Sequence, residues 1–145
     1  GSGSGDNGSN NNGNNPDDND DNNDDTPVSN NLKITIGPVS FNATLDNNET
    51  AKAFKRLLPM TVDMSELHGN EKSYYLSNGL PTASSNPGTI RTGDLMLYGS
   101  TCVVLFYETF STSYTYTRLG RITNPSGLAS ALGSGGVNVT FEITD

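Results

Sequence analysis

Two continuous apolar runs, separated by a three-residue turn, occur in the stretch Gly93-Asp94-Leu95-Met96-Leu97-Tyr98-Gly99-Ser100-Thr101-Cys102-Val103-Val104-Leu105-Phe106-Tyr107. A strand that is apolar at every position has both of its faces buried. We therefore predict that residues 95–98 and 102–107 form two central strands of the fold, which lie under its helices.

Shorter segments on both sides of this stretch alternate apolar and polar residues, as strands with one buried face do. A hairpin is predicted for residues 32–36 and 41–45, around Gly37-Pro38. Further strands are predicted at residues 60–64, 74–76, 118–122 and 137–143. The count of about eight strands indicates a mainly β protein built as a closed barrel.

Two short helices are predicted between these strands. Residues 49–58 place apolar side chains on one helical face, with Asp46 and Glu49 as a capping box and Pro59 as the stop. Asn124-Pro125 supplies an N-cap and a first-turn proline for a second helix that ends at Gly133. Residues 77–92 form a long loop, and loops of this length are often functional.

The composition divides the 145 residues into two parts at residue 31. Residues 1–31 contain one aliphatic side chain, Val28, and cannot bury enough apolar surface to offset the entropy of ordering. We predict a disordered acidic linker over residues 1–31 and one barrel domain over residues 32–145. All seven linker charges are negative, out of a net charge of −8, and the domain has no Lys/Arg cluster. Nucleic acid is therefore not an expected partner.

The linker resembles the flexible tracts that follow the lipidated cysteine of exported bacterial lipoproteins. This resemblance implies a cell-surface or periplasm-facing protein, attached to a membrane only through an N-terminal lipid anchor that preceded Gly1. Calcium binding by residues 17–25 is the alternative, but the run lacks the glycine and the closing glutamate of an EF-hand loop. A solvated spacer is the favoured interpretation.

Few residues offer metal or covalent chemistry. His68 is the only histidine, so a multi-histidine metal site is excluded, and its neighbour Gly69 favours a turn. Cys102 is the only cysteine, and its apolar neighbours predict an unreactive structural thiol. The Gly133-Ser134-Gly135-Gly136 run follows a helix and precedes a strand, which favours a turn over a phosphate loop. No metal or cofactor is expected.

The order of the predicted elements resembles that of a cyclophilin-type barrel. The segments that carry the resemblance are Thr50-Ala51-Lys52-Ala53-Phe54, residues 93–98 leading into 103–107, and Arg118-Leu119-Gly120-Arg121-Ile122 followed by Asn124-Pro125. Residues 32–143 are similar to the small bacterial cyclophilin-like domains, whose biochemical role is generally unassigned. The resemblance implies a cyclophilin-like closed β-barrel of about eight strands with two short helices.

The resemblance does not extend to the catalytic motif of cyclophilins, which are peptidyl-prolyl isomerases that use an arginine in a Phe-His-Arg strand. Residues 64–69 contain no arginine, and the family's Gln-Phe-Phe run is replaced by Val104-Leu105-Phe106. The chain also lacks the pocket tryptophan. Isomerase activity is therefore not expected. The alternative function is a divergent peptidyl-prolyl isomerase that uses Arg91 or Arg118 in place of the missing arginine.

A candidate binding region follows the second central strand. In an extended chain Tyr114, Tyr116 and Arg118 share one face, and aromatic rings beside a guanidinium suit a peptide, a sugar or a carboxylate. The predicted cleft consists of Phe106, Phe110, Tyr114, Tyr116 and Arg118, with Tyr75 and His68 as additions from neighbouring segments.

The favoured function is a binding module for a peptide or small-molecule ligand. One alternative is an aromatic ladder that only covers the barrel. Another is a structural partner in an exported assembly, which would expose an apolar edge.

Overall fold

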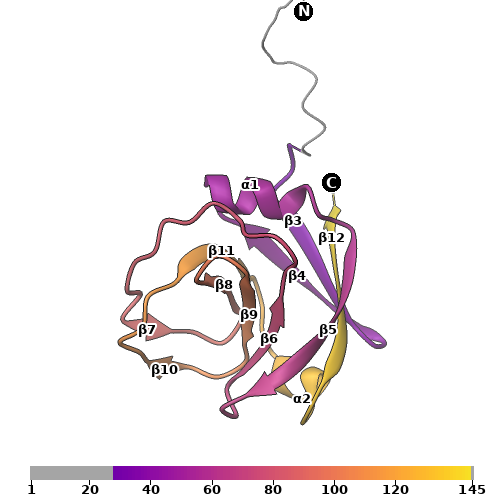
Figure 1. Ribbon diagram of the computed structural model, residues 1–145. Coiled ribbons are helices and arrows are strands. Elements are labelled where there is room, and N and C mark those ends of the chain that lie inside the picture. Colours follow the sequence, from indigo (N-terminus) through magenta and orange to yellow (C-terminus); the bar gives the residue numbers. More distant parts are fainter. Residues whose placement is uncertain (1–27, 145) are drawn as a thin grey trace, which may run out of the picture.

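The computed structural model describes residues 28–144, and its centre is a closed antiparallel barrel (Figure 1). The strand order around the barrel is β11-β4-β3-β12-β5-β6-β9-β8. The barrel strands are β3 (Asn31–Ile36), β4 (Val39–Leu45), β5 (Met60–Leu67), β6 (Glu71–Tyr75), β8 (Asp94–Tyr98), β9 (Cys102–Phe106), β11 (Thr117–Ile122) and β12 (Val137–Thr144). The predicted mainly β closed barrel is confirmed.

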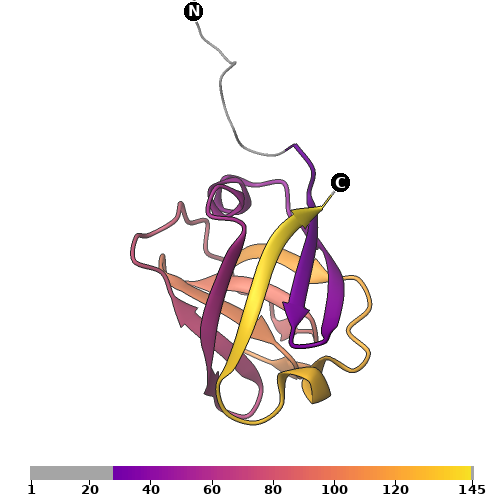
Figure 2. The ribbon, with the colours of Figure 1, turned by 90° about the vertical axis from the view of Figure 1, so that its right-hand side faces the viewer.

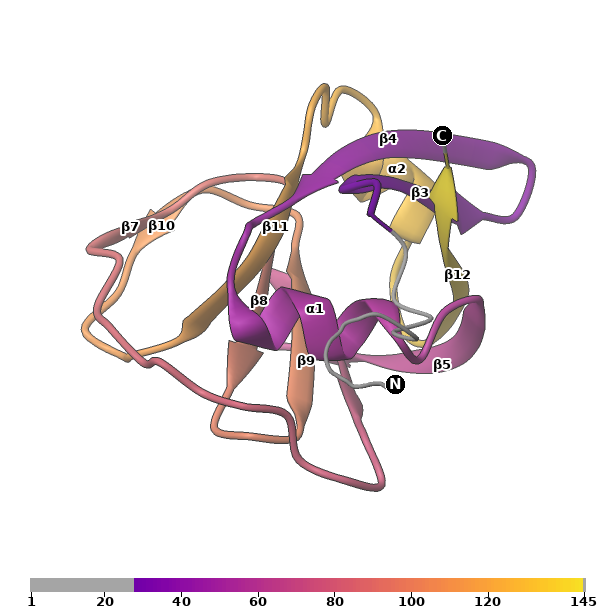
Figure 3. The ribbon, with the colours of Figure 1, turned by 90° about the horizontal axis from the view of Figure 1, so that it is seen from above.

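Two short helices lie at opposite ends of the barrel, as Figures 1 and 2 show. Helix α1 (Glu49–Lys55) crosses one end, where Figure 3 shows it from above. Its buried Phe54 packs edge-on against Phe141 of β12, with the ring centroids 5.7 Å apart. Helix α2 (Leu128–Leu132) closes the other end with its buried leucines.

Helix α1 begins at Glu49, as predicted, but the N-caps of both helices differ from those predicted. The N-cap of α1 is Asn48, whose Oδ1 accepts a hydrogen bond from Ala51 N at 2.7 Å, so the predicted capping role of Asp46 was wrong. In α2 the N-cap is Gly127, in the left-handed region with φ 83°. Asn124 Oδ1 instead accepts from Ser126 N within the preceding turn, because the first helical residue comes three positions later than the Pro125 signal indicates.

Strands β8 and β9 are buried on both faces, as their apolar runs predict. Leu97, Val103 and Leu105 point into the barrel and join its main core. The alternate side chains form a second apolar cluster on the outside of the barrel. This outer cluster consists of Ile90, Met96, Cys102, Val104, Phe106 and Tyr116, with Phe110 packed against it.

The outer face of β8 and β9 is not covered by helices, so that prediction was wrong. It is covered by two loop segments, residues 81–92 and 108–116, which together we call the arch. The arch contributes Ile90, Phe110 and Tyr116 to the outer cluster. Figures 1 and 3 both show its small sheet, β7 (Thr89–Ile90) and β10 (Phe110–Ser111), standing away from the barrel strands.

A network of polar groups closes the α2 end of the barrel around Lys72, which is fully buried. Its Nζ donates to Glu66 Oε1 at 2.8 Å, to Gly133 O at 2.8 Å and to Gly135 O at 2.6 Å. Nζ also lies 5.4 Å from the ring centroid of Tyr107, whose hydroxyl donates to Glu66 Oε1 at 2.8 Å. The predicted glycine-rich turn therefore serves as an acceptor for a buried ammonium group.

Most of the predicted linker, residues 1–27, lies outside the described residues. The end of it that is described joins the barrel: Ser29 Oγ donates to Thr144 O, and Asn30 O accepts from Leu45 N. Within residues 28–144, neither helix has the length and apolar character needed to cross a membrane.

Candidate functional site

Five aromatic rings form a continuous chain on the outer face of the barrel, at the arch. Centroid distances are 5.7 Å for Phe110–Phe106, 5.5 Å for Phe106–Tyr116, 5.6 Å for Tyr116–Tyr98 and 6.1 Å for Tyr98–Tyr114. Such tilted and edge-on pairs are favourable arrangements of aromatic rings. Phe106 and Tyr116 are buried in the outer cluster and Phe110 is partly buried against it, whereas Tyr98 and Tyr114 at the other end of the chain are exposed.

The register of the sheet places a fourth tyrosine beside this chain. Tyr75 on β6 and Tyr98 on β8 both lie opposite Cys102 on β9, so the three side chains form one row on the outer face. Tyr75 is 70% exposed, Tyr98 46% and Tyr114 62%. Burial raises the pKa of the Cys102 thiol between them, which agrees with the predicted structural role of this cysteine.

Strand β6 adds Glu71 and Ser73 to the same face, because alternate residues of a strand share one side. Glu71 is the register partner of Phe106 and is 7% exposed. Burial raises the pKa of the Glu71 carboxyl group; the nearby His68 lowers it, and Glu66 raises it further. The face thus combines aromatic rings with one nearly enclosed carboxyl group.

The structure brings four of the predicted site residues, Phe106, Phe110, Tyr114 and Tyr116, into the ring chain. It does not place Tyr114 and Tyr116 on one extended strand, because β10 ends at Ser111 and β11 begins at Thr117. Tyr116 is buried, while Tyr114 is exposed.

Arg118 lies at the edge of this face and is already paired. Its Nε donates to Oδ2 of Asp46 at 2.9 Å. Asp46 is the residue that was expected to cap α1. Arg91 is exposed in the arch, where its backbone N–H donates to Asp94 Oδ2. The isomerase alternative that depends on either arginine stays a prediction, decided by a proline-isomerisation assay.

His68 is exposed in the turn between β5 and β6, where its φ is 59°. The left-handed conformation at His68 agrees with the turn that Gly69 indicated.

Sequence reasoning missed Tyr98 and Glu71. Met96 and Tyr98 are two residues apart on one strand, so their side chains lie on the same face. This spacing could have indicated that Tyr98 belongs to the outer face. The alternation of Glu71, Ser73 and Tyr75 was the corresponding signal on β6. The signal on β8 was hidden because an apolar run shows no contrast between its two faces. The signal on β6 was hidden because Lys72, which points into the barrel, is charged like the outward-facing Glu71.

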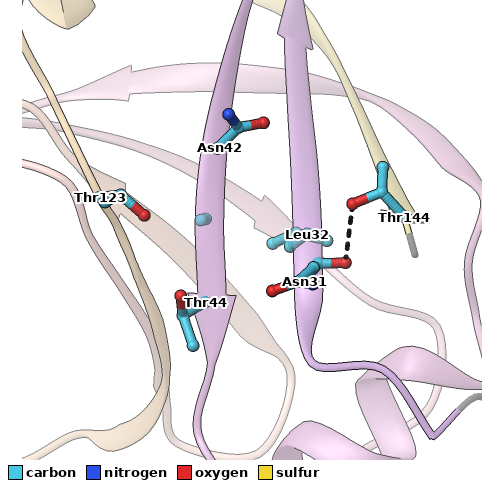
Figure 4. Close-up of a pocket in the computed structure, with 7 residues that line it drawn as sticks. Asn31, Leu32, Asn42, Thr44, Thr123 and Thr144 are labelled. Carbon is cyan, nitrogen blue, oxygen red and sulfur yellow. Dashed lines mark hydrogen bonds between the residues drawn. The ribbon is translucent and has the colours of Figure 1, made fainter.

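Two shallow cavities lie away from the aromatic face. Figure 4 shows one of about 270 Å³ beside the β3–β4 hairpin, where Thr144 Oγ1 donates to Asn31 O. Its lining is mostly polar: Asn31, Leu32, Asn42, Ala43, Thr44, Thr123 and Thr144. Another, of about 380 Å³, lies at the α1 end and includes Leu57 and Met60. Neither contains a titratable group other than Tyr74.

Metal-binding side chains do not gather anywhere in residues 28–144: no group of three His, Cys, Asp or Glu residues is placed to hold an ion.

Comparison with known proteins agrees with this architecture. The model of the cyclophilin-like family matches residues 34–142. The structure is similar to the solution structure of a hypothetical protein from Archaeoglobus fulgidus, with a TM-score of 0.54 and 19% sequence identity, covering 81% of this chain and 96% of that one. At this identity the likeness shows the fold alone. No curated protein matches the chain. The chain belongs to the cyclophilin-like family.

Proposed function

We propose that this cyclophilin-like domain is a ligand-binding module whose ligand contacts the tyrosine face, defined as Tyr75, Tyr98 and Tyr114. The observation that carries the proposal is the exposure of these three rings directly beside the buried outer cluster. Rings that only cover a barrel are expected to be buried by their neighbours, as Phe106 and Tyr116 are. Tyr75 and Tyr114 remain more than half exposed.

Exposed tyrosines of this kind suit the binding of a peptide or a small molecule. Each ring supplies a large contact area, loses little rotamer entropy on binding and keeps a hydroxyl group for hydrogen bonds. The buried part of the ring chain holds Tyr98 in place through Tyr116. The tyrosine face is therefore partly preorganised, which lowers the entropic cost of association.

We further propose that the domain is exported and tethered through the acidic Asn- and Asp-rich segment that precedes the barrel. The support is the composition of residues 1–27, which contain no aliphatic residue and seven aspartates. Incorporation of an alkyne-labelled fatty acid into the native protein, together with cleavage by protease added to intact cells, tests this part. Absence of lipid label and protection from protease would contradict it.

The three methionines provide natural reporters for a test of binding. Met96 lies in the outer cluster, Met64 in the main core, and Met60 beside the α1-end cavity. With ¹³C-methyl methionine, each gives a separate NMR signal. The probes are acetyl-Gly-X-Gly-amide peptides in which X is aromatic, aliphatic, proline, cationic or anionic. We expect at least one peptide to shift the Met96 signal saturably and leave the Met64 signal unchanged.

The Tyr98→Ser variant is expected to weaken that binding at least tenfold, about 1.4 kcal/mol. Leu57→Ser is the matched control, because Leu57 is also exposed and apolar but lies at the α1 end. The proposal fails if no peptide shifts the Met96 signal, or if binding is unchanged in Tyr98→Ser.

A further inference from the structure

Within the part of the chain that the structure describes, Glu71 is a nearly enclosed carboxylate of the outer face that forms no hydrogen bond or ion pair. Its side chain forms no hydrogen bond or ion pair within residues 28–144, although Glu71 is only 7% exposed. By contrast, Glu66 accepts from Lys72, and the buried Asp94 accepts from Arg121 Nε at 2.9 Å. Among residues 28–144 the buried side-chain oxygen without a hydrogen-bond partner is Asn70 Oδ1, so the Glu71 oxygens keep some contact with solvent. A carboxylate with little water around it and no donor gains from a cationic partner.

The carboxylate faces the aromatic rings rather than the inside of the barrel. Lys72, the next residue along β6, points inward, so Glu71 points outward. Its negative charge contributes to raising the pKa of Tyr116, after burial, and also raises that of Cys102. Both residues belong to the outer cluster, so the carboxylate lies along this cluster and within electrostatic reach of it.

The protein itself contains a completed version of the same arrangement. At the α2 end, a carboxylate (Glu66) and a tyrosine ring (Tyr107) surround the ammonium group of Lys72, at 2.8 Å and 5.4 Å. On the outer face the carboxylate of Glu71 lies along the cluster that holds Phe106 and Tyr116, and no cationic side chain of residues 28–144 forms an ion pair with it. His68 lies close enough to lower the pKa of Glu71 but forms no hydrogen bond with it.

We propose that Glu71 receives a cationic group of the ligand, a primary ammonium or a guanidinium, beside the rings of Phe106 and Tyr116. A carboxylate supplies the counter-charge, and aromatic faces attract cations within about 6 Å of the ring centroid. This inference rests on the proposed function and names its ligand class: a basic side chain of a peptide or a free small amine.

The test compares cationic probes with neutral ones of similar shape. Acetyl-Gly-Lys-Gly-amide is paired with its norleucine counterpart, and acetyl-Gly-Arg-Gly-amide with its citrulline counterpart, with the Met96 signal as the readout. We expect each cationic peptide to bind at least tenfold more tightly than its neutral counterpart. Cadaverine distinguishes the source: equal binding of cadaverine and the lysine peptide indicates a free amine, and weaker binding of cadaverine indicates a peptide.

The Glu71→Gln variant is expected to abolish this preference and to leave binding of the norleucine peptide unchanged. It should fold, because the substitution removes an unpaired buried charge, and thermal unfolding verifies this. Glu108→Gln is the matched control, since Glu108 is an exposed carboxylate on the adjacent segment. Equal binding of cationic and neutral peptides, or a preference that survives in Glu71→Gln, overturns the inference but leaves the tyrosine face as a binding site. Absence of any Met96 shift overturns both.

Discussion

Lys72 is a charged residue at a fully buried position, and such positions are ordinarily occupied by apolar residues. Its ammonium group has three donors, and the structure supplies three acceptors: Glu66 and the carbonyls of Gly133 and Gly135. The network therefore connects the β5–β6 hairpin to the turn before β12. Lysine is rarely fully buried, and nothing in the alternation around β6 indicates these acceptors, so the sequence did not predict this network.

Lys72→Met is expected to destabilise the protein by about 3 kcal/mol, because it leaves the carbonyls of Gly133 and Gly135 without their donor and removes the counter-charge of Glu66. Urea denaturation measures the change in the free energy of unfolding. The control is Lys52→Met, which removes the exposed ion pair with Glu49 and should cost less than about 0.5 kcal/mol. Equal effects of the two substitutions would show that the buried network contributes no more than a surface pair.

Tyr107 makes the same network sensitive to high pH. Burial, followed by the hydrogen bond to the Glu66 carboxylate, raises the pKa of Tyr107 from 10.0 to about 12. Between these two pKa values, the hydroxyl group of Tyr107 thus keeps its proton in the folded state and loses it in the unfolded state. Stability from this group is present below pH 10.0 and is lost as the pH rises towards about 12.

Tyr107→Phe is therefore expected to reduce the loss of stability over this alkaline range. At neutral pH it should cost about 1 kcal/mol, for the lost hydrogen bond. Denaturation at a series of pH values measures both effects. Parallel pH profiles of the variant and the parent protein would contradict this assignment.

At the scale of single elements, Gly120 on β11 is required by a close approach of two backbones. A Cβ at this position would lie 2.5 Å from Thr44 O and 3.0 Å from Leu45 Cα, next to an irregularity in the β11–β8 register. Gly120→Ala is expected to destabilise the barrel by about 2 kcal/mol, because neighbouring backbone cannot move aside as a side chain can. Gly136→Ala is the control, since its nearest contact, Met64 O, lies at 3.4 Å. Thermal unfolding of both variants tests this difference.

Helix α1 depends on Asn48 through two hydrogen bonds of one side chain. Oδ1 accepts from Ala51 N, and Nδ2 donates to Arg118 O at 3.0 Å. Asn48→Ala is expected to cost about 1–2 kcal/mol, and Asn48→Asp less, because aspartate retains the cap and loses only the second bond. Equal losses of stability in the two variants would show that the bond to β11, and not the cap, is the important one.

The strands differ in how clearly their sequence indicates them. Alternation located the β3–β4 hairpin and β12, because one face of these strands is buried and the other is polar. The extra length of β5, which continues to Leu67, contains no buried side chain, so the alternation that marks a strand is absent there.

The loops account for most of what the sequence did not reveal. The arch has little regular structure, so its residues carry no periodicity, and its position over β8 and β9 depends on tertiary contacts. The aromatic residues of the arch could therefore be predicted as site residues only from their residue type. Which rings contact one another, and that Tyr98 and Glu71 lie on the same face, follows only from the register of the sheet.

At the scale of the whole molecule, the protein has two apolar clusters on the two sides of the same strands. The main core is enclosed by a closed barrel, whereas the outer cluster is covered by an arch whose own sheet has only two residues in each strand. The Ser85–Tyr116 bridge adds two further backbone hydrogen bonds, but most residues of the arch are exposed. A cover with so few buried residues is expected to open locally without unfolding of the barrel.

Phe110→Ala should therefore speed amide exchange in residues 81–92 and 108–116 while changing the free energy of global unfolding little. Phe141→Ala in the main core should lower the global free energy by about 3–5 kcal/mol. Hydrogen exchange measured by NMR distinguishes the two cases. Uniform acceleration of exchange in Phe110→Ala would show that the arch and the barrel unfold as one unit.

The position of β12 between β3 and β5 has a consequence for how the chain folds. Asn31, at the start of β3, is the register partner of Thr144, at the end of β12. The loop that closes the barrel therefore includes nearly the whole domain, and contacts between residues so distant in sequence form slowly. On the ribosome the barrel cannot close until β12 has left the exit tunnel, so until then the inward faces of β3 and β5 stay exposed, and exposed apolar strands of this kind are prone to aggregate.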